Sequence, residues 1–408
     1  MTGLVLLSCR SEGQPEQYQS TQKDFQFGAD VLLNEKLDLL EGKNIGLITN
    51  VTGVLSNGSL LLDSLISHKI KIAAVFSPEH GFNLSELAGD DVPEAELSKK
   101  IKVFSLYGNT RKPAPSMLKG IDILIFDMQD IGARFYTYIS TLYYVVEAAA
   151  ENNIPLLVLD RPNPLGGLYV DGPVLEDEYK SFVGITNIPV VHGMTIGELA
   201  LMFNDKISSS GKKAEIQIIK MKNWKRSFLW TDLGLNWVPT SPNIPNFETV
   251  LVYPATCFLE GTNISEGRGT YFPFITIGAP FIDQDLLMGE LKTFGNNTYK
   301  ITGTKFTPVD IEGMSVNPKY ENELCSGIHI ESVKDSVFTS VRFGVQLLYV
   351  INKLYPGKFE IKNYFNTLWG TEKIKKQLEA GEQPEIIFNS WQNDLNIFKQ
   401  YRKQFLLY

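Results

Sequence analysis

The chain has 408 residues and a formal net charge of −8, from 38 Lys and Arg against 46 Asp and Glu. This acidic balance excludes nucleic acid as an expected partner, because a nucleic-acid-binding protein presents a basic surface that displaces counterions from phosphate. Apolar residues make up 43% of the chain and charged residues 21%, which is ordinary for a globular protein, and three cysteines are too few for a disulfide framework.

The first residues resemble a targeting signal. Residues 1–9 read MTGLVLLSC, and Leu6-Leu7-Ser8-Cys9 resembles a bacterial lipobox, in which the cysteine is lipidated after signal cleavage. Polar residues follow up to about residue 25, as in a flexible tether. We expect a bacterial envelope protein, periplasmic or secreted, with a lipid anchor at Cys9. The alternatives are an ordinary disordered terminus or a start codon placed too late.

From residue 43 onward, short aliphatic runs alternate with amphipathic segments. Buried strands are predicted at 44–49, 72–76, 101–106, 122–126 and 155–159, and helices at 60–66 and 138–151. Continuous aliphatic runs separated by helices are typical of a parallel sheet covered on both faces. The prediction is a Rossmann-like, doubly wound α/β domain that spans residues 26–240.

The chain after residue 240 is less regular. A region rich in proline and glycine comes first, and helices are then predicted at 283–293, 333–354 and 386–405. We interpret residues 241–408 as a smaller α+β C-terminal domain that closes a cleft against the first domain.

Polar side chains follow three of the predicted strands. They are Glu79 and His80 after the second strand, Asp127, Gln129, Asp130, Arg134 and Tyr136 after residue 126, and Arg161 and Asn163 after residue 159. The carboxyl ends of parallel strands meet at one edge of the sheet, where ligands bind. The sequence therefore predicts a polar pocket rich in carboxylates at this edge.

Several familiar chemistries lack their motifs. No G-x-G-x-x-G follows the first strand, and no phosphate-binding loop, G-x-S-x-G elbow or H-E-x-x-H is present. We therefore expect neither a cofactor nor a metal.

An ordered set of strings runs through most of residues 43–280. It comprises GLITN (46–50), PEHGF (78–82), SLYG (105–108), FDMQDIGARFYTYI (126–139), VLDRPNP (158–164), DGPVLE (171–176), HGMTIGELA (192–200), SPNIP (241–245), YPAT (253–256) and EGTNISEGRGT (260–270). In these strings the chain resembles the exo-β-N-acetylmuramidase family NamZ, formerly a domain of unknown function.

The resemblance implies an exo-acting glycosidase. Such an enzyme releases non-reducing terminal N-acetylmuramic acid from muropeptides or glycan ends during cell-wall turnover. The glutamate of the PEHG string, here Glu79, is the implied catalytic acid. Glycoside hydrolysis normally needs a second carboxyl group, for which Asp127, Asp130 and Glu266 are candidates, unless the substrate's own acetamido oxygen takes that role.

The remaining candidates would bind the sugar. His80 could adjust the ionisation of Glu79 or bond a hydroxyl group, as could His192, although either could be a buried structural imidazole. One arginine is expected to grip the lactyl carboxylate, because a guanidinium offers two parallel hydrogen bonds. The arginines considered are Arg134, Arg161 and Arg268, and the candidate polar contacts are Gln129, Asp130, Tyr136, Asn163, Asn263 and Glu266. An arginine paired with a nearby aspartate is the structural alternative.

Two other functions stay open at this point. One is a metal-assisted hydrolase with Glu79, His80, Asp127 and His192 as ligands. The other is a catalytically silent lipoprotein that binds muropeptides. Asn83-Leu84 keeps this last hypothesis open, because family members often carry Arg-Gly there.

Overall fold

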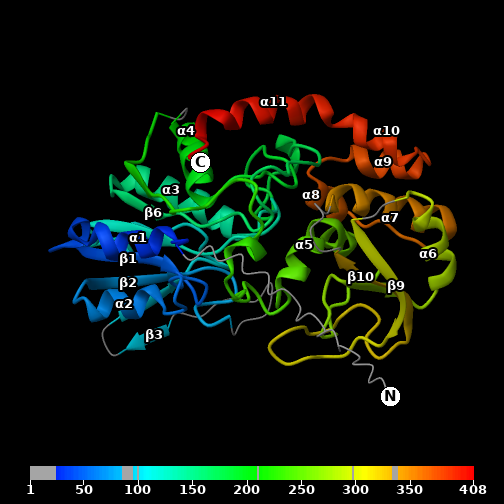
Figure 1. Ribbon diagram of the computed structural model, residues 1–408, viewed down its shortest axis with the longest axis horizontal. Helices are drawn as coiled ribbons and strands as arrows, with labels where there is room; N and C mark the ends of the chain where they lie inside the picture. Colours follow the sequence, from blue (N-terminus) through cyan, green and yellow to red (C-terminus); the bar gives the residue numbers. More distant parts are fainter. Residues whose placement is uncertain (1–23, 85–94, 99–100, 209–210, 296–297, 333–338) are drawn as a thin grey trace, which may run out of the picture.

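The computed structural model describes residues 24–84, 95–98, 101–208, 211–295, 298–332 and 339–408. The lipobox expected at 1–9 and the first six residues of the helix expected at 333–354 lie outside these ranges. Two lobes stand side by side, and one long helix, α11 (Gln392–Arg402), crosses from the C-terminal lobe back to the N-terminal one (Figure 1).

The N-terminal lobe is built on a seven-stranded sheet with the order β3-β4-β2-β1-β5-β6-β7. Strand β3 pairs antiparallel with β4, and every other pairing in this sheet is parallel. The strands are β1 Asn44–Thr49, β2 Lys71–Ser77, β3 Ala95–Ser98, β4 Ile101–Ser105, β5 Ile123–Asp127, β6 Leu156–Leu159 and β7 Ile216–Ile219.

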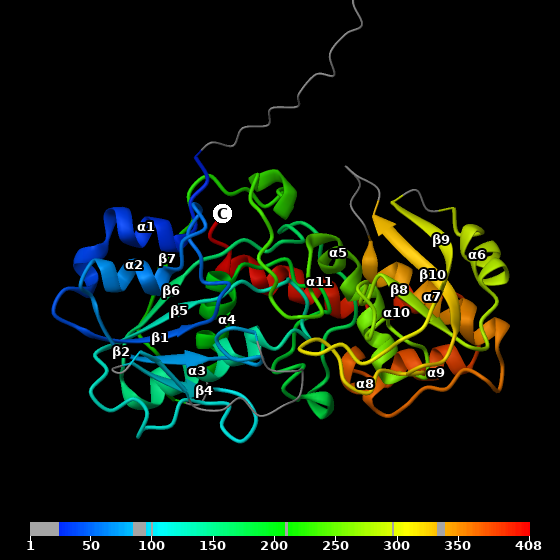
Figure 2. The ribbon, with the colours of Figure 1, turned by 90° about the horizontal axis from the view of Figure 1, so that it is seen from below.

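Helices cover both faces of this sheet because neighbouring strand residues point to opposite sides. Leu47 and Val75 belong to the core beneath α1 and α2, whereas Ile48 and Phe76 belong to the core beneath α3 and α4. Figure 2 shows the two helix layers on opposite sides of the strands. The helices are α1 Gly28–Glu35, α2 Leu61–Ser67, α3 Tyr138–Asn152 and α4 Ile196–Ser208.

The C-terminal lobe combines a small antiparallel sheet, in the order β8-β10-β9, with a group of helices. Its strands are β8 Thr276–Ala279, β9 Tyr299–Phe306 and β10 Cys325–Ser332, and its helices are α5 Phe247–Thr256, α6 Gln284–Lys292, α7 Ser340–Leu354, α8 Tyr364–Trp369 and α9 Lys373–Glu379. The predicted fold class, a Rossmann-like domain followed by a smaller α+β part, is confirmed.

The helix predicted at 386–405 is wrong in one respect, because it is two helices. Helix α10 (Pro384–Ser390) and helix α11 (Gln392–Arg402) meet at Trp391, and a 3₁₀ turn, Lys403–Phe405, follows. Trp391 is buried, and its indole N–H donates to Asp171 Oδ1 at 3.0 Å. This anchor to the N-terminal lobe lies at the break between the two helices.

Two helices and two strands of the N-terminal lobe were not predicted: α1, α4, β3 and β7. The proposed division at residue 240 remains a prediction. No helix in the described ranges has the length and apolar character needed to cross a membrane.

Candidate active site

Glu79 stands in a tight turn directly after β2. Gly81 N–H donates to Pro78 O at 3.1 Å, and both His80 and Gly81 adopt left-handed backbone conformations, with φ of 69° and 72°. A left-handed histidine costs on the order of 1–2 kcal/mol. The turn reverses the chain at the carboxyl end of β2, and so presents the Glu79 side chain to the space between the lobes.

That space is a cavity of about 760 Å³. The N-terminal side contributes Glu79, His80, Tyr107, Arg111, Phe135, Tyr136, Thr137, Tyr138, Ser181, Phe182 and Val183; the C-terminal side contributes Ser241, Ile244, Tyr253, Cys257, Glu260, Arg268, Phe274, Met314, Ser315, Val316, Asn317, Tyr364, Thr367 and Leu368. A pocket with walls from both lobes can enclose the terminal unit of a polymeric substrate.

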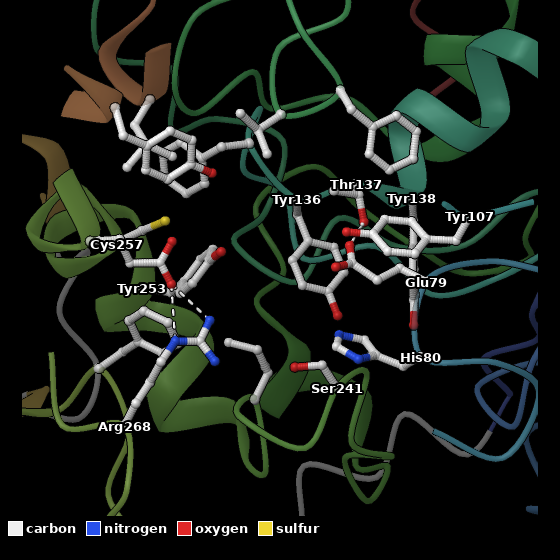
Figure 3. Close-up of a pocket in the computed structure, with 18 of the residues that line it drawn as sticks. Glu79, His80, Tyr107, Tyr136, Thr137, Tyr138, Ser241, Tyr253, Cys257 and Arg268 are labelled. Atoms are coloured by element: carbon white, nitrogen blue, oxygen red, sulfur yellow. Dashed lines mark hydrogen bonds and ion pairs between the residues drawn. The ribbon is translucent and has the colours of Figure 1, made fainter. Parts of the chain in front are cut away.

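Around Glu79, hydroxyl groups and aromatic rings form one wall. Thr137 Oγ1 donates to Glu79 Oε2 at 2.7 Å, which fixes the orientation of the carboxyl group. Figure 3 shows Tyr107 beside Glu79, with the Tyr136 hydroxyl pointing toward His80 and Ser241. Burial raises the pKa of Tyr136, so this hydroxyl stays protonated at neutral pH and can donate a hydrogen bond.

A second carboxylate, Glu260, occupies the opposite wall. Arg268 donates to Glu260 Oε1 from Nε at 3.0 Å and from Nη2 at 2.7 Å, and these bonds are drawn in Figure 3. Burial disfavours the charged guanidinium, but the carboxylates of Glu260 and Glu266 outweigh it and raise the pKa of Arg268. The Arg268 guanidinium therefore remains charged.

Glycines bring this wall together. A Cβ atom at Gly261 would lie 2.4 Å from the Phe365 Cα, so only glycine lets α8 approach the residue next to Glu260. Gly267 has φ of 80°, and a Cβ there would lie 2.3 Å from Thr276 O. The loop can therefore fold back against β8 and place Arg268 opposite Glu260.

Cys257 also lines the pocket but does not supply a nucleophile. Burial raises the pKa of its thiol well above the ordinary value. A thiol that stays protonated is a poor nucleophile.

Asp127 and Arg161 do not contact the pocket, which corrects two predictions. Their side chains are 0% and 1% exposed, and Arg161 donates to Asp127 Oδ1 at 2.6 Å and to Oδ2 at 3.0 Å. Burial raises the pKa of Asp127 while Arg161 opposes that change. The pair joins the ends of β5 and β6 as a structural contact, which is the alternative considered for such an arginine.

Arg134 and Asn163 are structural as well. Arg134 is fully buried and donates to the carbonyl oxygens of Pro173, Ile188 and Leu368 at 2.8–2.9 Å, so it ties both lobes together. Asn163 accepts from Leu165 N–H at 3.0 Å and donates to Met194 O at 3.1 Å. Their hydrogen bonds are made to the backbone, and neither residue lines the cavity.

A buried polar layer contains three more of the predicted residues. Asp130 Oδ2 accepts from Gly132 N–H at 2.7 Å and lies 3.9 Å from His192 Nε2. Burial raises the pKa of Asp130 to about 7 and lowers the pKa of His192 to about 3. Gln129 donates to the carbonyl oxygens of Asp130 and Pro162. None of the three lines the cavity.

In the C-terminal lobe, Asn263 and Glu266 also lie outside the cavity. Asn263 bonds the backbone of Lys358 and Glu360, which holds two loops together. Glu266 is buried and accepts from Lys319 Nζ at 2.8 Å, with Arg268 Nε 3.7 Å away on its other side. It therefore positions Arg268 rather than the substrate.

The structure thus places Glu79, His80, Tyr136 and Arg268 in the pocket, from the set considered. It also shows pocket residues that sequence reasoning missed: Tyr107, Arg111, Ser241, Tyr253, Glu260 and Tyr364. Four of these stand in the strings SLYG, SPNIP, YPAT and EGTNISEGRGT, which was a usable signal. Arg111 and Tyr364 stand in none of the strings.

The metal-assisted alternative is not supported by this arrangement. Asp127 pairs with Arg161, and His192 Nδ1 accepts from Met194 N–H at 3.2 Å, so neither lies with Glu79 and His80 in the cavity. Across the described residues, no group of three or more His, Cys, Asp or Glu side chains is placed to hold a metal ion.

A two-lobed α/β fold with a carboxyl group at a strand end, in a pocket lined by aromatic side chains from both lobes, defines a class of enzyme suited to acting on the end of a sugar chain. Family models described as exo-β-N-acetylmuramidase NamZ, N-terminal and C-terminal, match residues 45–248 and 251–408. The chain belongs to this family, and it is accordingly a glycosidase.

Comparisons with individual proteins agree with this family assignment. The chain is 43% identical over 416 aligned positions to the peptidoglycan β-N-acetylmuramidase NamZ of Bacillus subtilis strain 168, with 100% of this chain and 98% of the relative covered. Two crystal structures of DUF1343 family proteins from Bacteroides fragilis NCTC 9343 are similar, with TM-scores of 0.85 and 0.75 at 33% and 34% identity. Each comparison covers 94% of this chain and 99% of the other.

Proposed function

We propose that this protein releases N-acetylmuramic acid from the non-reducing end of peptidoglycan fragments, with Glu79 as the catalytic acid. One observation supports the role most directly: Glu79 lies in a pocket walled by both lobes, and Thr137 fixes its orientation at 2.7 Å. A pocket accepts one terminal sugar, whereas an enzyme that cuts within a chain needs an open groove. The substrate would be a muropeptide or a glycan end.

We assign the role of the second catalytic group, beside Glu79, to the acetamido group of the substrate. Asp127, Asp130 and Glu266 do not line the cavity, and Glu260 already accepts two hydrogen bonds from Arg268. The acetamido carbonyl oxygen would therefore attack C1 as the glycosidic bond breaks and Glu79 gives its proton to the leaving oxygen. Water would then attack C1, return a proton to Glu79 and open the oxazolinium ring. Glu260 would orient the acetamido N–H.

The activity is tested with a chromogenic β-N-acetylmuramic acid glycoside and the N-acetylglucosamine analogue as control. Release from the muramic substrate by the wild-type protein, lost in Glu79→Gln and partly kept in Thr137→Val, supports the proposal. Folded wild-type protein that binds N-acetylmuramic acid but releases no chromophore contradicts it and supports the silent binding protein.

The same reaction followed by NMR tests the route. Two displacements at C1 retain configuration, so the β anomer must appear first. The α anomer as first product would overturn the role assigned to the acetamido group while leaving Glu79 as the acid.

We also propose that the protein is lipid-anchored at Cys9 in the bacterial envelope. The support is the string LLSC, preceded by an apolar run and followed by polar residues. Labelling of the full chain with an alkyne fatty acid in the expressing bacterium tests it. Label on the wild type that Cys9→Ser abolishes is expected; an unlabelled wild type would exclude the anchor.

A further inference from the structure

The two cations that line the pocket differ in their carboxylate neighbours. Among its described lining residues, the guanidinium groups are those of Arg111 and Arg268, and the carboxylates are those of Glu79 and Glu260. Arg268 is held by Glu260, with Glu266 3.7 Å away on the far side. Two carboxylates therefore already surround this cation, so it is a weak site for another anion.

Arg111 is different. Its guanidinium lies over the ring of Phe182, with the Cζ atom 4.5 Å from the ring centroid, and no described carboxylate forms an ion pair with it. The side chain is exposed at the wall of the cavity. A guanidinium stacked on an aromatic face has one planar edge left for hydrogen bonds.

Phe182 is a firm platform for that guanidinium. Its ring stacks on Tyr144 at 6.4 Å with an interplanar angle of 15°, and Tyr107 packs against it at 5.7 Å. Ser140 Oγ donates to the Phe182 carbonyl oxygen at 2.7 Å. These contacts limit where the guanidinium can lie before a ligand arrives, which lowers the entropy lost on binding.

The Arg111 subsite also lies on the Glu79 side of the pocket. Tyr107, which packs against Phe182, stands beside Glu79 in Figure 3. When the glycosidic oxygen of a bound sugar reaches Glu79, the Arg111 guanidinium would thus lie close to the substituents of that sugar ring.

We propose that Arg111, stacked on Phe182, forms a carboxylate-binding subsite that selects a terminal sugar bearing an acidic ether. The inference rests on the proposed function, because N-acetylmuramic acid differs from N-acetylglucosamine by a lactyl ether whose carboxylate a guanidinium grips through two parallel hydrogen bonds. Arg111 thereby takes the role that the sequence had assigned to one of Arg134, Arg161 and Arg268.

The test compares two chromogenic substrates, β-N-acetylmuramic acid and its lactyl carboxamide, which has the same shape without the charge. We expect Arg111→Gln to lower kcat/KM on the acid about 30-fold, mainly through KM, and to change the amide less than twofold. Arg111→Lys should recover part of the loss, because an ammonium keeps the charge without the planar fork.

Lys112→Gln is the matched control, since Lys112 pairs with Glu147 and Glu151 on α3 and does not line the pocket. Its kinetics should equal those of the wild type. Equal losses on acid and amide in Arg111→Gln, or a wild type that does not distinguish the two, would overturn the subsite.

Calorimetry with free N-acetylmuramic acid and its carboxamide separates this inference from the proposed function. If no variant hydrolyses either substrate, the proposed function fails, yet a preference for the acid that disappears in Arg111→Gln still supports the subsite. If hydrolysis proceeds and the acid binds no better than the amide, the subsite alone is wrong.

Discussion

Glu260 differs from Glu79 in its partners, although both carboxylates line one pocket. Glu79 accepts a hydrogen bond from a neutral hydroxyl, and Glu260 forms an ion pair with Arg268. We expect Glu260→Gln to lower kcat/KM about 10-fold, because a neutral amide holds Arg268 less firmly. Glu79→Gln should cost about 10³-fold, within the range for a missing general acid.

Steady-state kinetics of both variants on the same chromogenic substrate measure this difference. A loss in Glu260→Gln as large as that in Glu79→Gln would contradict it. Glu260 would then be the second catalytic carboxyl group, and Arg268 would set its ionisation.

Asp130 makes stability depend on pH. Burial raises its pKa from 3.8 to about 7 in the folded state, and an unfolded chain returns it to the ordinary value. Between about pH 4 and 7, Asp130 is therefore ionised in the unfolded chain but still protonated in the folded protein. The contribution of Asp130 to the unfolding free energy is fully present below pH 4 and is lost as the pH rises toward 7. The loss is about 1.4 kcal/mol per pH unit within that interval.

Urea unfolding at pH 4.5, 6.0 and 7.5 measures this dependence. Asp130→Asn can still accept the Gly132 hydrogen bond, and it should flatten the fall in unfolding free energy across these values. An unchanged slope in Asp130→Asn would mean that Asp130 ionises in the folded protein as it does in water.

At the scale of elements, α5 and α7 pack with their backbones close together. A Cβ atom at Gly344 would lie 2.6 Å from Ala255 O and 3.1 Å from Ala255 Cα. Gly344→Ala should therefore push the two helices apart and lower the unfolding free energy by about 1–3 kcal/mol. Helix α5 carries Tyr253 into the pocket, so kcat/KM should fall as well.

Thermal unfolding compares this variant with Gly289→Ala. Gly289 lies on α6, where an added Cβ meets no atom within 4 Å, and alanine there should stabilise the helix by up to about 1 kcal/mol. If Gly344→Ala raised the melting temperature in the same way, the helices would have room that the structure does not show.

On the scale of the whole molecule, the C-terminal tail fastens the second lobe to the first sheet. Tyr408 donates to Asp160 Oδ2 at 2.7 Å and accepts from Met221 N–H at 2.8 Å, next to the carboxyl end of β6. Leu407 N–H donates to Glu198 Oε1 at 2.9 Å. Helix α11 carries the chain to this point across the top of both lobes (Figure 1).

Tyr408→Phe should lower the unfolding free energy by about 1–2 kcal/mol, because it removes a part-buried hydrogen bond to the Asp160 carboxyl group and the one accepted from Met221 N–H. Chemical denaturation measures the change, and Tyr271→Phe at an exposed tyrosine is the control, expected to have no effect. Equal stability in both variants would show that the tail lies on the sheet without holding it.

Most of the N-terminal sheet could be predicted from the residues alone. Runs such as residues 123–126 are apolar and continuous because both faces of a parallel strand are buried, and that pattern is local. Glu79 could also be predicted as a site residue, since it closely follows such a run and stands in the PEHGF string. The break at Trp391 was not predicted, and the buried contact that this residue makes there is with Asp171, 220 positions away in the chain.

The side-chain roles at the strand ends were decided by tertiary structure. Three charged residues end or follow strands: Asp127, Arg161 and Glu79. Their positions in the sequence do not show which of the three side chains faces the cavity. Packing buries Asp127 and Arg161 as a pair, and it brings Glu260 and Arg268 from the other lobe to face Glu79. A sequence shows which groups are available, whereas burial and the meeting of the two pocket walls depend on segments far apart in the chain, and only folding brings those together.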